Sequence, residues 1–218
     1  MVKRLLDVAL AAVALVLASP LMLLAAIGIR LASPGRVLYR ARRVGRDGKE
    51  FDMLKLRTMH ATTGEGNSRV TAPEDMRVFP LGRILRLTKI DELPQLINIL
   101  RGDMSVIGPR PEDPYYVDRY FTPVQRKTLS TRPGLASPGS LFHDTHGHRL
   151  LDAGDPEASY IRELLPLKLA LDLVYVKRAS LAYDLKLILR TLGIICAKLA
   201  GRREFRDPPE MTAARRFV

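Results

Sequence analysis

The 218-residue sequence predicts an α+β fold that is mainly helical. Three observations support this prediction: an N-terminal apolar run, one pair of short strand-like segments around a turn, and several segments whose apolar residues recur at helical spacing. The composition fits one compact domain, because 47% of the residues are hydrophobic. The sole cysteine, Cys196, cannot form an intramolecular disulfide, so we expect a reducing compartment.

The formal net charge of +12 predicts a polyanionic partner, which could be nucleic acid, an anionic membrane surface or a phosphorylated substrate. The chain contains no tryptophan and no recognition-helix or zinc pattern, so we expect no nucleic acid partner. A non-enzymatic, basic, membrane-tethered module that binds anionic lipid or nucleic acid stays open as the alternative to an enzyme.

The N-terminal apolar run covers residues 8–29, which contain no ionisable side chain. A straight helix of this length would measure about 33 Å, enough to cross a bilayer core of about 30 Å. A cleaved signal peptide is disfavoured because the run is too long and begins directly after Asp7. A spanning helix, a re-entrant helix and a buried core helix are the three remaining alternatives.

The flanks and the middle of this run favour the re-entrant helix. Lys3 and Arg4 precede the run, and further basic residues follow it: Arg30, Arg36, Arg40, Arg42 and Arg43. The positive-inside rule therefore places both ends in the cytoplasm. Pro20 removes a backbone donor, and Ser19 can satisfy a carbonyl that Pro20 frees, so the helix can kink at these two residues and return. We expect residues 1–32 to form this re-entrant membrane helix.

The segments after the run predict a hairpin followed by short helices. Residues 37–39 and 50–56 are predicted strands around a turn at 45–48. Residues 61–75 are predicted to form a polar loop, and residues 131–140 an irregular segment rich in Pro, Gly and Ser. Apolar residues at helical spacing predict amphipathic helices over three ranges, 81–87, 93–100 and 114–129.

Long apolar stripes cover residues 164–199 and alternate with basic residues: Lys168, Lys177, Arg178, Lys186, Arg190 and Lys198. This pattern is typical of amphipathic helices that lie on an anionic membrane surface. Packing of the stripes against residues 93–100, with solvated lysines, is the alternative. Residues 201–218 are polar and contain two adjacent prolines, so we expect a mobile tail.

The candidate chemistry lies between residues 55 and 132, where Asp91 and Glu92 are adjacent carboxylates. Pro94 is best tolerated at a helix start, and Thr88 offers an alternative cap, so both options place the pair near a helix N-terminus. The amides there favour ionised carboxylates, which suits a nucleophile or ligands of Mg²⁺. Simple capping of a surface helix is the alternative.

Three basic residues accompany the pair. Arg110 stands between Pro109 and Pro111, which restrict its backbone and present the guanidinium in a form suited to phosphate. A structural turn with a solvated arginine is the alternative. Lys55 and Arg57 alternate with leucines, so on a strand they would project from one basic face.

These residues together resemble the bacterial sugar transferases, and more closely the small monotopic phosphoglycosyl transferases. The resemblance covers residues 3–199 and rests on the following motifs in order: Ser19-Pro20, Lys55-Leu56-Arg57-Thr58-Met59, Arg86, Asp91-Glu92-Leu93-Pro94-Gln95-Leu96, Gly102-Asp103-Met104-Ser105, Gly108-Pro109-Arg110-Pro111 and Arg132-Pro133-Gly134. It implies a re-entrant helix over 1–32 and a cytoplasmic catalytic domain over 33–200, with an α/β hairpin and helices at the membrane surface. The location implied is the cytoplasmic face of the bacterial inner membrane.

The resemblance also implies Mg²⁺-dependent transfer of a sugar-1-phosphate from a UDP-sugar to undecaprenyl phosphate, with release of UMP, as the first membrane step of glycoconjugate assembly. Carried onto this sequence, Asp91 is the nucleophile that forms a covalent aspartyl phosphosugar, and Asp91 and Glu92 hold the Mg²⁺. Five residues are candidates to bind substrate phosphate: Lys55, Arg57, Arg86, Arg110 and Arg132. Membrane lipid is a further partner, and assembly into a homo-oligomer stays open.

Two features leave questions open. Residues 135–142 depart from the usual family segment near the expected nucleotide pocket, so the identity of the donor sugar stays open. The pathway and the phosphate that each basic residue contacts are open as well. Residues 143–148 contain three histidines, but consecutive residues without a distant partner rarely build a closed metal site. We expect these histidines to lie on a loop and to bind no metal. The short chain suggests the minimal form of the family, without added spanning helices.

Overall fold

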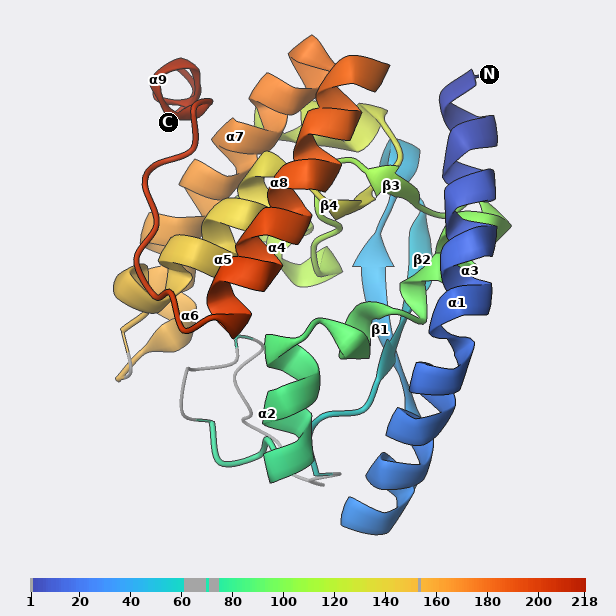
Figure 1. Cartoon of the computed structure of the whole chain (residues 1–218). Helices are drawn as coiled ribbons and strands as arrows, with labels where there is room; N and C mark the ends of the chain where they lie inside the picture. The colour runs from blue at the N-terminus through green and yellow to red at the C-terminus, as the bar shows by residue number, and fades with distance from the viewer. Residues whose placement is uncertain (1, 61–69, 71–74, 153) are drawn as a thin grey trace.

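The computed structural model describes residues 2–60, 70, 75–152 and 154–218, so the predicted loop at 61–75 lies almost entirely outside the described residues. The fold is α+β and mainly helical, as predicted. Helix α1 (Val2–Ala32) runs along one side of the molecule, α7 (Leu165–Arg178) and α8 (Leu181–Leu199) form the other side, and two small sheets lie between them (Figure 1). These elements enclose the candidate site between the sheets and α5.

The hairpin consists of antiparallel β1 (Leu38–Val44) and β2 (Glu50–Leu56), paired from Leu38 opposite Leu56 to Val44 opposite Glu50. Its turn contains Asp47 and Gly48, both with positive φ, which explains the glycine at the second position. Strand β1 extends well beyond the predicted residues 37–39. The prediction stopped early because the exposed positions of β1 carry arginines, which hide the alternating pattern.

A second sheet pairs β3 (Ser105–Ile107) with β4 (Gly134–Ala136) in parallel. The predicted irregular segment at 131–140 is therefore partly wrong. The strands come so close that a Cβ at Gly134 would lie 2.0 Å from the backbone nitrogen of Gly108, so glycine makes this pairing feasible. Helix α5 (Pro138–Leu150) follows directly, and Ser137 caps it by accepting a hydrogen bond from the Ser140 amide.

Helix α5 also corrects the expectation for residues 143–148, which are helical rather than part of a loop. The remaining short elements are α2 (Pro80–Leu87), α3 (Gln95–Arg101), α4 (Pro114–Tyr120), a 3₁₀ segment at Gln125–Ser130, α6 (Pro156–Ser159) and a π-helical turn at Tyr160–Leu164. The helix predicted over 114–129 is thus two helical segments. Pro123 lies in the break between them.

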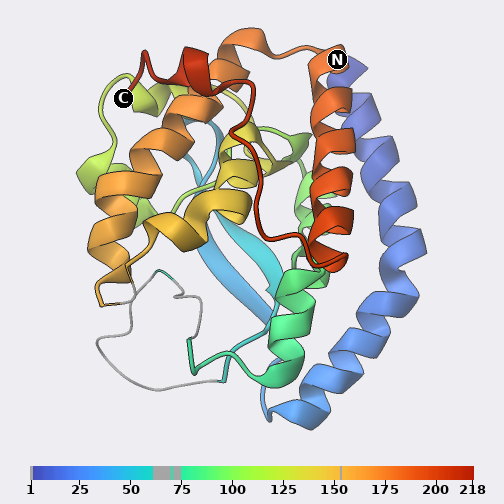
Figure 2. The ribbon, with the colours of Figure 1, turned by 60° about the vertical axis from the view of Figure 1, so that its left-hand side comes forward.

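Helix α1 (Val2–Ala32) is continuous through Pro20, and it bends along its length in both ribbon views (Figures 1 and 2). Pro20 cannot donate to the carbonyl of Val16, and the Ser19 hydroxyl donates to that carbonyl instead, at 2.8 Å. Ser19 thus satisfies the carbonyl that Pro20 leaves without a helical donor, and the kink and return at these residues stay a prediction. By length and composition α1 is able to cross a membrane, and most of its apolar surface faces outward.

Both ends of α1 are attached to the same domain. Near the N-terminus, the Lys3 ammonium lies 2.6 Å from a carboxylate oxygen of Asp184, and Asp7 accepts hydrogen bonds from the Ser105 hydroxyl and the Val106 amide. Beyond the C-terminus of α1, the Arg57 guanidinium donates to two backbone carbonyls, those of Ser33 and Pro34. The fold therefore holds the start and the end of the apolar helix on one body.

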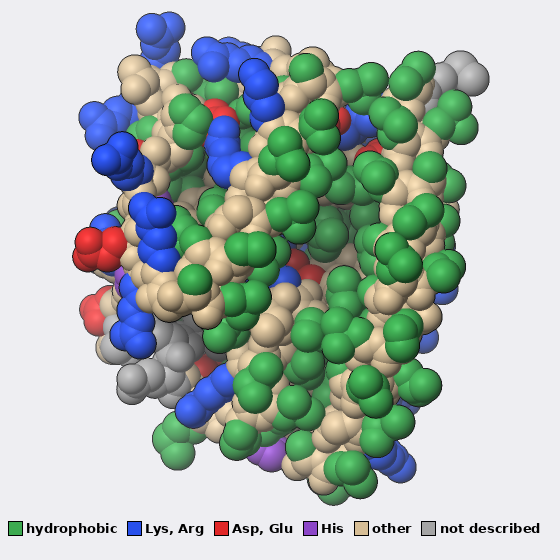
Figure 3. Space-filling view, in the orientation of Figure 1, with side chains coloured by type: hydrophobic (Ala, Val, Ile, Leu, Met, Phe, Trp, Pro, Cys, Tyr) green, Lys and Arg blue, Asp and Glu red, His purple; other side chains and the backbone are tan. Residues whose placement is uncertain are grey.

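For residues 164–199 we predicted membrane-surface helices, and the structure gives a different result for each of the two helices in this range. Helix α7 (Leu165–Arg178) is a core helix, and Lys168 is buried in an ion pair with Glu112 rather than facing lipid. Helix α8 (Leu181–Leu199) instead exposes a stripe of apolar side chains: Leu181, Leu185, Leu189, Leu192 and Leu199. Figure 3 shows hydrophobic side chains gathered over α8 and α1 on one face.

Residues 201–218, which we expected to be a mobile tail, lie across the helices in this structure (Figure 2). The tail contains α9 (Met211–Ala214), whose Met211 and Ala214 are buried in the cluster around α7. Glu210 accepts hydrogen bonds from Arg190 of α8 at 2.8 and 3.0 Å and from the Tyr183 hydroxyl at 2.7 Å. These contacts could not be predicted from a local sequence pattern, because they join residues that are far apart in the chain.

Candidate active site

The carboxylate pair lies in a 3₁₀ turn, Ile90–Glu92, between α2 and α3. Helix α3 begins directly after Pro94, as predicted. Thr88 does not cap this turn, because its hydroxyl donates back to the carbonyl of Ile84 and completes the end of α2. Asp91 and Glu92 are both buried, with 5% and 8% of their surface exposed, so they are more than surface caps.

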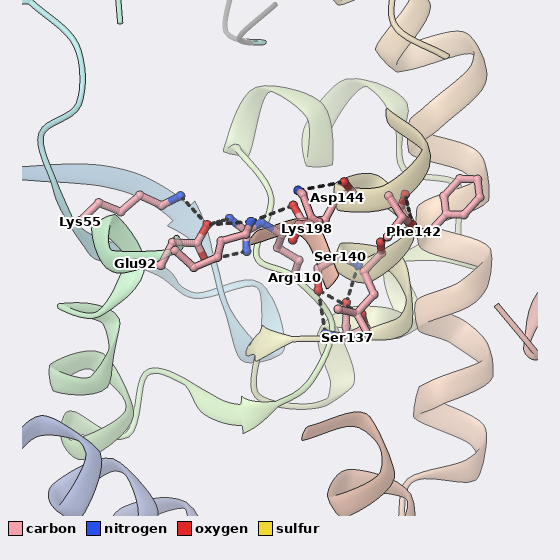
Figure 4. Close-up of polar contacts among 11 residues, drawn as sticks. Lys55, Glu92, Arg110, Ser137, Ser140, Phe142, Asp144 and Lys198 are labelled. Atoms are coloured by element: carbon pink, nitrogen blue, oxygen red, sulfur yellow. Dashed lines mark hydrogen bonds and ion pairs between the residues drawn. The ribbon is translucent and has the colours of Figure 1, made fainter. Parts of the chain in front are cut away.

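Cations surround Glu92 (Figure 4). The Arg110 guanidinium donates to both carboxylate oxygens, at 2.7 and 3.2 Å, and the Lys55 ammonium donates to one of them at 3.4 Å. Lys89 lies 3.8 Å away. Burial alone would raise the pKa of Glu92, but these three cations hold it well below its ordinary value. Glu92 is therefore a fixed anion that organises the basic residues.

Asp91 has a different environment. Its Oδ1 atom is buried and has no hydrogen-bond partner among the residues that the structure describes. Burial and the adjacent Glu92 raise the pKa of Asp91 to about 6, although Lys55, Lys89 and Arg86 oppose the shift. At neutral pH, Asp91 is thus mostly ionised but poorly stabilised, which suits a carboxylate that attacks phosphorus.

Gln95, in the first turn of α3, has a fully buried carboxamide whose nitrogen and oxygen both lack a partner within the described part of the chain. Such an unpaired buried group costs about 1–3 kcal/mol, so proteins seldom keep one without a ligand or ordered water. Because Gln95 follows Asp91 by only four residues, three unpaired polar atoms lie within about one helical turn. We missed Gln95 in the sequence because a glutamine in a helix has no distinctive pattern.

Two further acidic residues connect the loops around the pair. Asp144 of α5 accepts a hydrogen bond from Lys89 at 2.7 Å. Asp172 of α7 accepts one from the Arg110 amide at 3.2 Å and another from the Gly139 amide at 2.9 Å. Asp172 thus ties the Arg110 loop to the start of α5.

The sequence analysis missed the roles of Lys89, Asp144 and Asp172. Asp144 lies within residues 143–148, where we expected a loop, and no pattern in the sequence singles out Lys89. Asp172 is an isolated acid within an apolar helical stripe, and that isolation is a signal that could have identified it. An acid at a buried helical position needs donors from elsewhere in the fold.

The five predicted phosphate-binding residues fall into two groups. Lys55 and Arg110 contact Glu92, and Arg86 lies near enough to Asp91 to oppose its pKa shift while donating to the Thr58 hydroxyl at 2.9 Å. Arg57 instead donates to carbonyls at the end of α1, and Arg132 donates to the Gly102 carbonyl at 2.9 Å. The structure brings the first three, but not these two, to the carboxylate pair.

The described residues contain no group of three or more His, Cys, Asp or Glu side chains that could hold a metal by themselves. Mg²⁺ commonly binds through one or two carboxylates together with substrate phosphates. The unpaired Oδ1 of Asp91 fits that requirement. Both oxygens of Glu92 are engaged by Arg110, so Asp91 is the better Mg²⁺ ligand of the predicted two.

A family model described as bacterial sugar transferase matches residues 1–198. UDP-glucose:undecaprenyl-phosphate glucose-1-phosphate transferase of Caulobacter vibrioides is 42% identical over 194 residues, covering 87% of this chain and 68% of that protein. UDP-N-acetylgalactosamine-undecaprenyl-phosphate N-acetylgalactosaminephosphotransferase of Aeromonas hydrophila is 34% identical, covering 92% of this chain and 45% of that protein. The exopolysaccharide production protein ExoY of Rhizobium meliloti is 35% identical, and the match covers 90% of this chain and 86% of that protein. The chain therefore spans less than half of the Aeromonas relative.

Proposed function

The chain belongs to the bacterial sugar transferase family, and from this premise we propose that it transfers a sugar-1-phosphate from a UDP-sugar to undecaprenyl phosphate and releases UMP. The names of the Caulobacter and Aeromonas relatives supply the donor and acceptor classes. The observation that carries the proposal is the unequal pair: Glu92 neutralised by Arg110, and Asp91 buried with an unpaired oxygen.

In the proposed first step, an Asp91 oxygen attacks the phosphorus that bears the sugar. A bond forms between this oxygen and the phosphorus, the bond from that phosphorus to the bridging oxygen breaks, and the electron pair leaves with UMP. In the second step, a phosphate oxygen of the lipid attacks the same phosphorus and releases the Asp91 carboxylate. Splitting the reaction lets the soluble donor product depart before the lipid acceptor reacts.

The surrounding cations supply electrostatic stabilisation for this chemistry. Lys55, Lys89, Arg86 and Arg110 approach the pair from separate elements, and the fold positions them before any substrate arrives. A Mg²⁺ ion at Asp91 would neutralise diphosphate charge. Asp172 and Asp144 keep the loops that carry Arg110 and Lys89 in place.

We further propose that α1 is re-entrant and that the protein is monotopic on the cytoplasmic face of the bacterial inner membrane. The attachment of both ends of α1 to one domain supports this topology, because a spanning helix would carry Lys3 away from Asp184. The Ser19 bond to Val16 supports a bend at Pro20. The exposed apolar stripe of α8 would then rest on the same membrane surface.

UMP release tests the proposal directly. The purified protein is incubated with Mg²⁺, undecaprenyl phosphate and a panel of UDP-sugars that includes UDP-glucose and UDP-N-acetylgalactosamine. We expect turnover with at least one donor only when lipid is present, and a single equivalent of UMP per enzyme when lipid is omitted. Failure of a broad donor panel with a folded protein would favour the non-enzymatic, anionic-lipid-binding module, an alternative that the relatives do not support.

A further inference from the structure

A cavity of about 1080 Å³ opens on the hairpin, apart from the carboxylate pair. Its lining comes from the segment after α1, from both strands of the hairpin and from α3, and it includes Arg36, Arg40, Arg57, Arg101, Leu54 and Ile97. Of these residues only Arg57 belongs to the predicted site. The proposed reaction therefore leaves this groove without a role.

The groove is positively charged without local compensation. Four of its lining residues are arginines, and the described lining contains no acidic residue. Arg36, Arg40 and Arg101 are exposed and form no ion pair with any residue that the structure describes, whereas Arg57 donates to backbone carbonyls. The rest of the lining is largely apolar. Guanidinium groups around an apolar floor suit a ligand that carries a phosphate next to a hydrocarbon portion.

The described lining of the groove shares no residue with the carboxylate pair or with the cations that contact it. Lys55 reaches Glu92, while the preceding residue of the strand, Leu54, lines the groove. Leu54 and its cross-strand partner Arg40 both line the groove, and neither Asp91 nor Glu92 is among the described lining residues. The groove is therefore unsuited to the reacting phosphate.

The chain connection places the groove near the membrane. Arg36 follows the last residue of α1, Ala32, by only four residues, which span at most about 14 Å. A helix end that leaves the apolar core enters the headgroup layer, so residues this close to it are within reach of lipid phosphates. Arginines near that layer gain from an anionic leaflet.

We propose that this groove binds the headgroup phosphate of an anionic glycerophospholipid, separately from the polyprenol phosphate acceptor. The bound lipid would fix the hairpin against the leaflet beside the end of α1. The proposal concerns lipid binding alone, so its outcome does not depend on the proposed transfer reaction.

Native mass spectrometry of the full chain, released from nanodiscs that contain equal amounts of phosphatidylglycerol and phosphatidylcholine, tests this proposal. The test variant combines Arg36→Gln, Arg40→Gln and Arg101→Gln. The matched control combines Arg203→Gln, Arg206→Gln and Arg216→Gln, which removes the same charge from exposed positions of the tail. A thermal melt by circular dichroism verifies that both remain folded, and the single variant Arg40→Glu is the substitute if the triple variant does not.

We expect the parent and the control to retain phosphatidylglycerol in preference to phosphatidylcholine, and the groove variant to retain about tenfold less of it. Equal retention by both triple variants would overturn the proposal, because net charge rather than the groove would then select the lipid. Displacement of the lipid by millimolar inorganic phosphate, or by equimolar undecaprenyl phosphate, would also overturn it in favour of a free phosphate or the acceptor.

Discussion

Arg110 donates to both carboxylate oxygens of Glu92, at 2.7 and 3.2 Å, and this pairing leaves Asp91 as the member of the acidic pair with an unpaired oxygen. Two adjacent buried carboxylates would otherwise repel each other strongly. Arg110 stabilises the negative charge of Glu92. Asp91 has no such partner for its Oδ1 atom among the described residues, so burial and repulsion from Glu92 raise the pKa of Asp91. One residue therefore organises the site, and the other is poised to react.

Replacement Asp91→Asn should abolish turnover and stabilise the fold. The amide cannot attack phosphorus, and it removes a buried charge that opposes folding at neutral pH. We expect a gain of about 1–3 kcal/mol in the free energy of unfolding at pH 7, measured by denaturant titration in detergent. Near-parental UMP release, with deamidation excluded by mass spectrometry, would disprove the nucleophile assignment.

The pH dependence of UMP release should reflect the raised pKa of Asp91. Turnover needs the ionised carboxylate, so kcat/KM should fall as the pH drops through about 6. The stability of the parent protein should change in the opposite direction to its activity. As the pH falls below about 6, Asp91 in the folded state takes up a proton, and the free-energy cost of burying its charge disappears. The stability advantage of Asp91→Asn at pH 7 should therefore shrink toward pH 4. An advantage that is constant over this range would contradict the shift.

Arg110→Lys should lower kcat/KM by about 100-fold or more, because a lysine cannot make the two-point contact with Glu92. Arg132→Lys is the matched comparison, since the Arg132 guanidinium donates to the Gly102 carbonyl rather than to the carboxylate pair. We expect it to keep activity within about fivefold of the parent. Equal losses in both variants would show that Arg132 reaches the substrate phosphates, as the sequence predicted.

Gln95→Met should lower UMP turnover by about tenfold or more without destabilising the protein. The substitution replaces an unpaired buried carboxamide by an apolar side chain of similar length. Asn98→Leu is the control, because the buried Asn98 amide is fully used: it accepts from the Leu54 amide and donates to the Asp52 carbonyl. That change should cost about 1–3 kcal/mol of stability. A destabilised Gln95→Met protein would indicate a purely structural glutamine.

Cysteine labelling in inverted and right-side-out vesicles tests the topology of α1. Val2→Cys and Pro34→Cys, each combined with Cys196→Ser, place single thiols at exposed positions on either side of the apolar run. Gly35 is unsuitable, because its φ is +117° and a Cβ there would lie 3.1 Å from Arg57. We expect a membrane-impermeant reagent to label both from the cytoplasmic side. Labelling of position 2 only from the opposite side would establish a spanning helix.

Replacing Ser19 and Pro20 together by Leu should shift the protein toward that spanning arrangement, because an unbroken apolar helix matches the bilayer thickness. The same two cysteines provide the measurement. An unchanged labelling pattern would mean that the contacts of Lys3 and Asp7 with the domain, rather than Ser19 and Pro20, determine the topology.

The sequence predicted the elements whose signals are local. The apolar run, helix α2 and the start of α3 after Pro94 all depend on residues close together in the chain. The expected return of the chain at Pro20 stays a prediction, because α1 is continuous there. The acidic pair and the Pro-Arg-Pro sequence are likewise compact motifs, and the structure brings Arg110 onto Glu92. Their chemical roles stay predictions.

Prediction from the sequence was wrong or incomplete where contacts between residues far apart in the chain determine the position of a side chain. Asp172 and Asp144 meet the site only after α5 and α7 have packed against the sheets. Lys168 has the spacing of a headgroup-facing lysine, but it is buried, where it forms an ion pair with Glu112, 56 residues away in the sequence. Arg57 follows the strand pattern that suggested phosphate binding, yet the loop after α1 supplies the carbonyls that engage it.

The ion pair between Lys3 and Asp184 joins positions 181 residues apart, and this separation constrains the order of events during biosynthesis. At about 5–20 residues per second, roughly 10–40 s pass between translation of the two side chains. The apolar helix thus meets the bilayer long before its anchoring partner exists. In the re-entrant arrangement that we propose, the flanking positive charges and the proline therefore act on the orientation of α1 first, and the ion pair can form only after Asp184 has been synthesised.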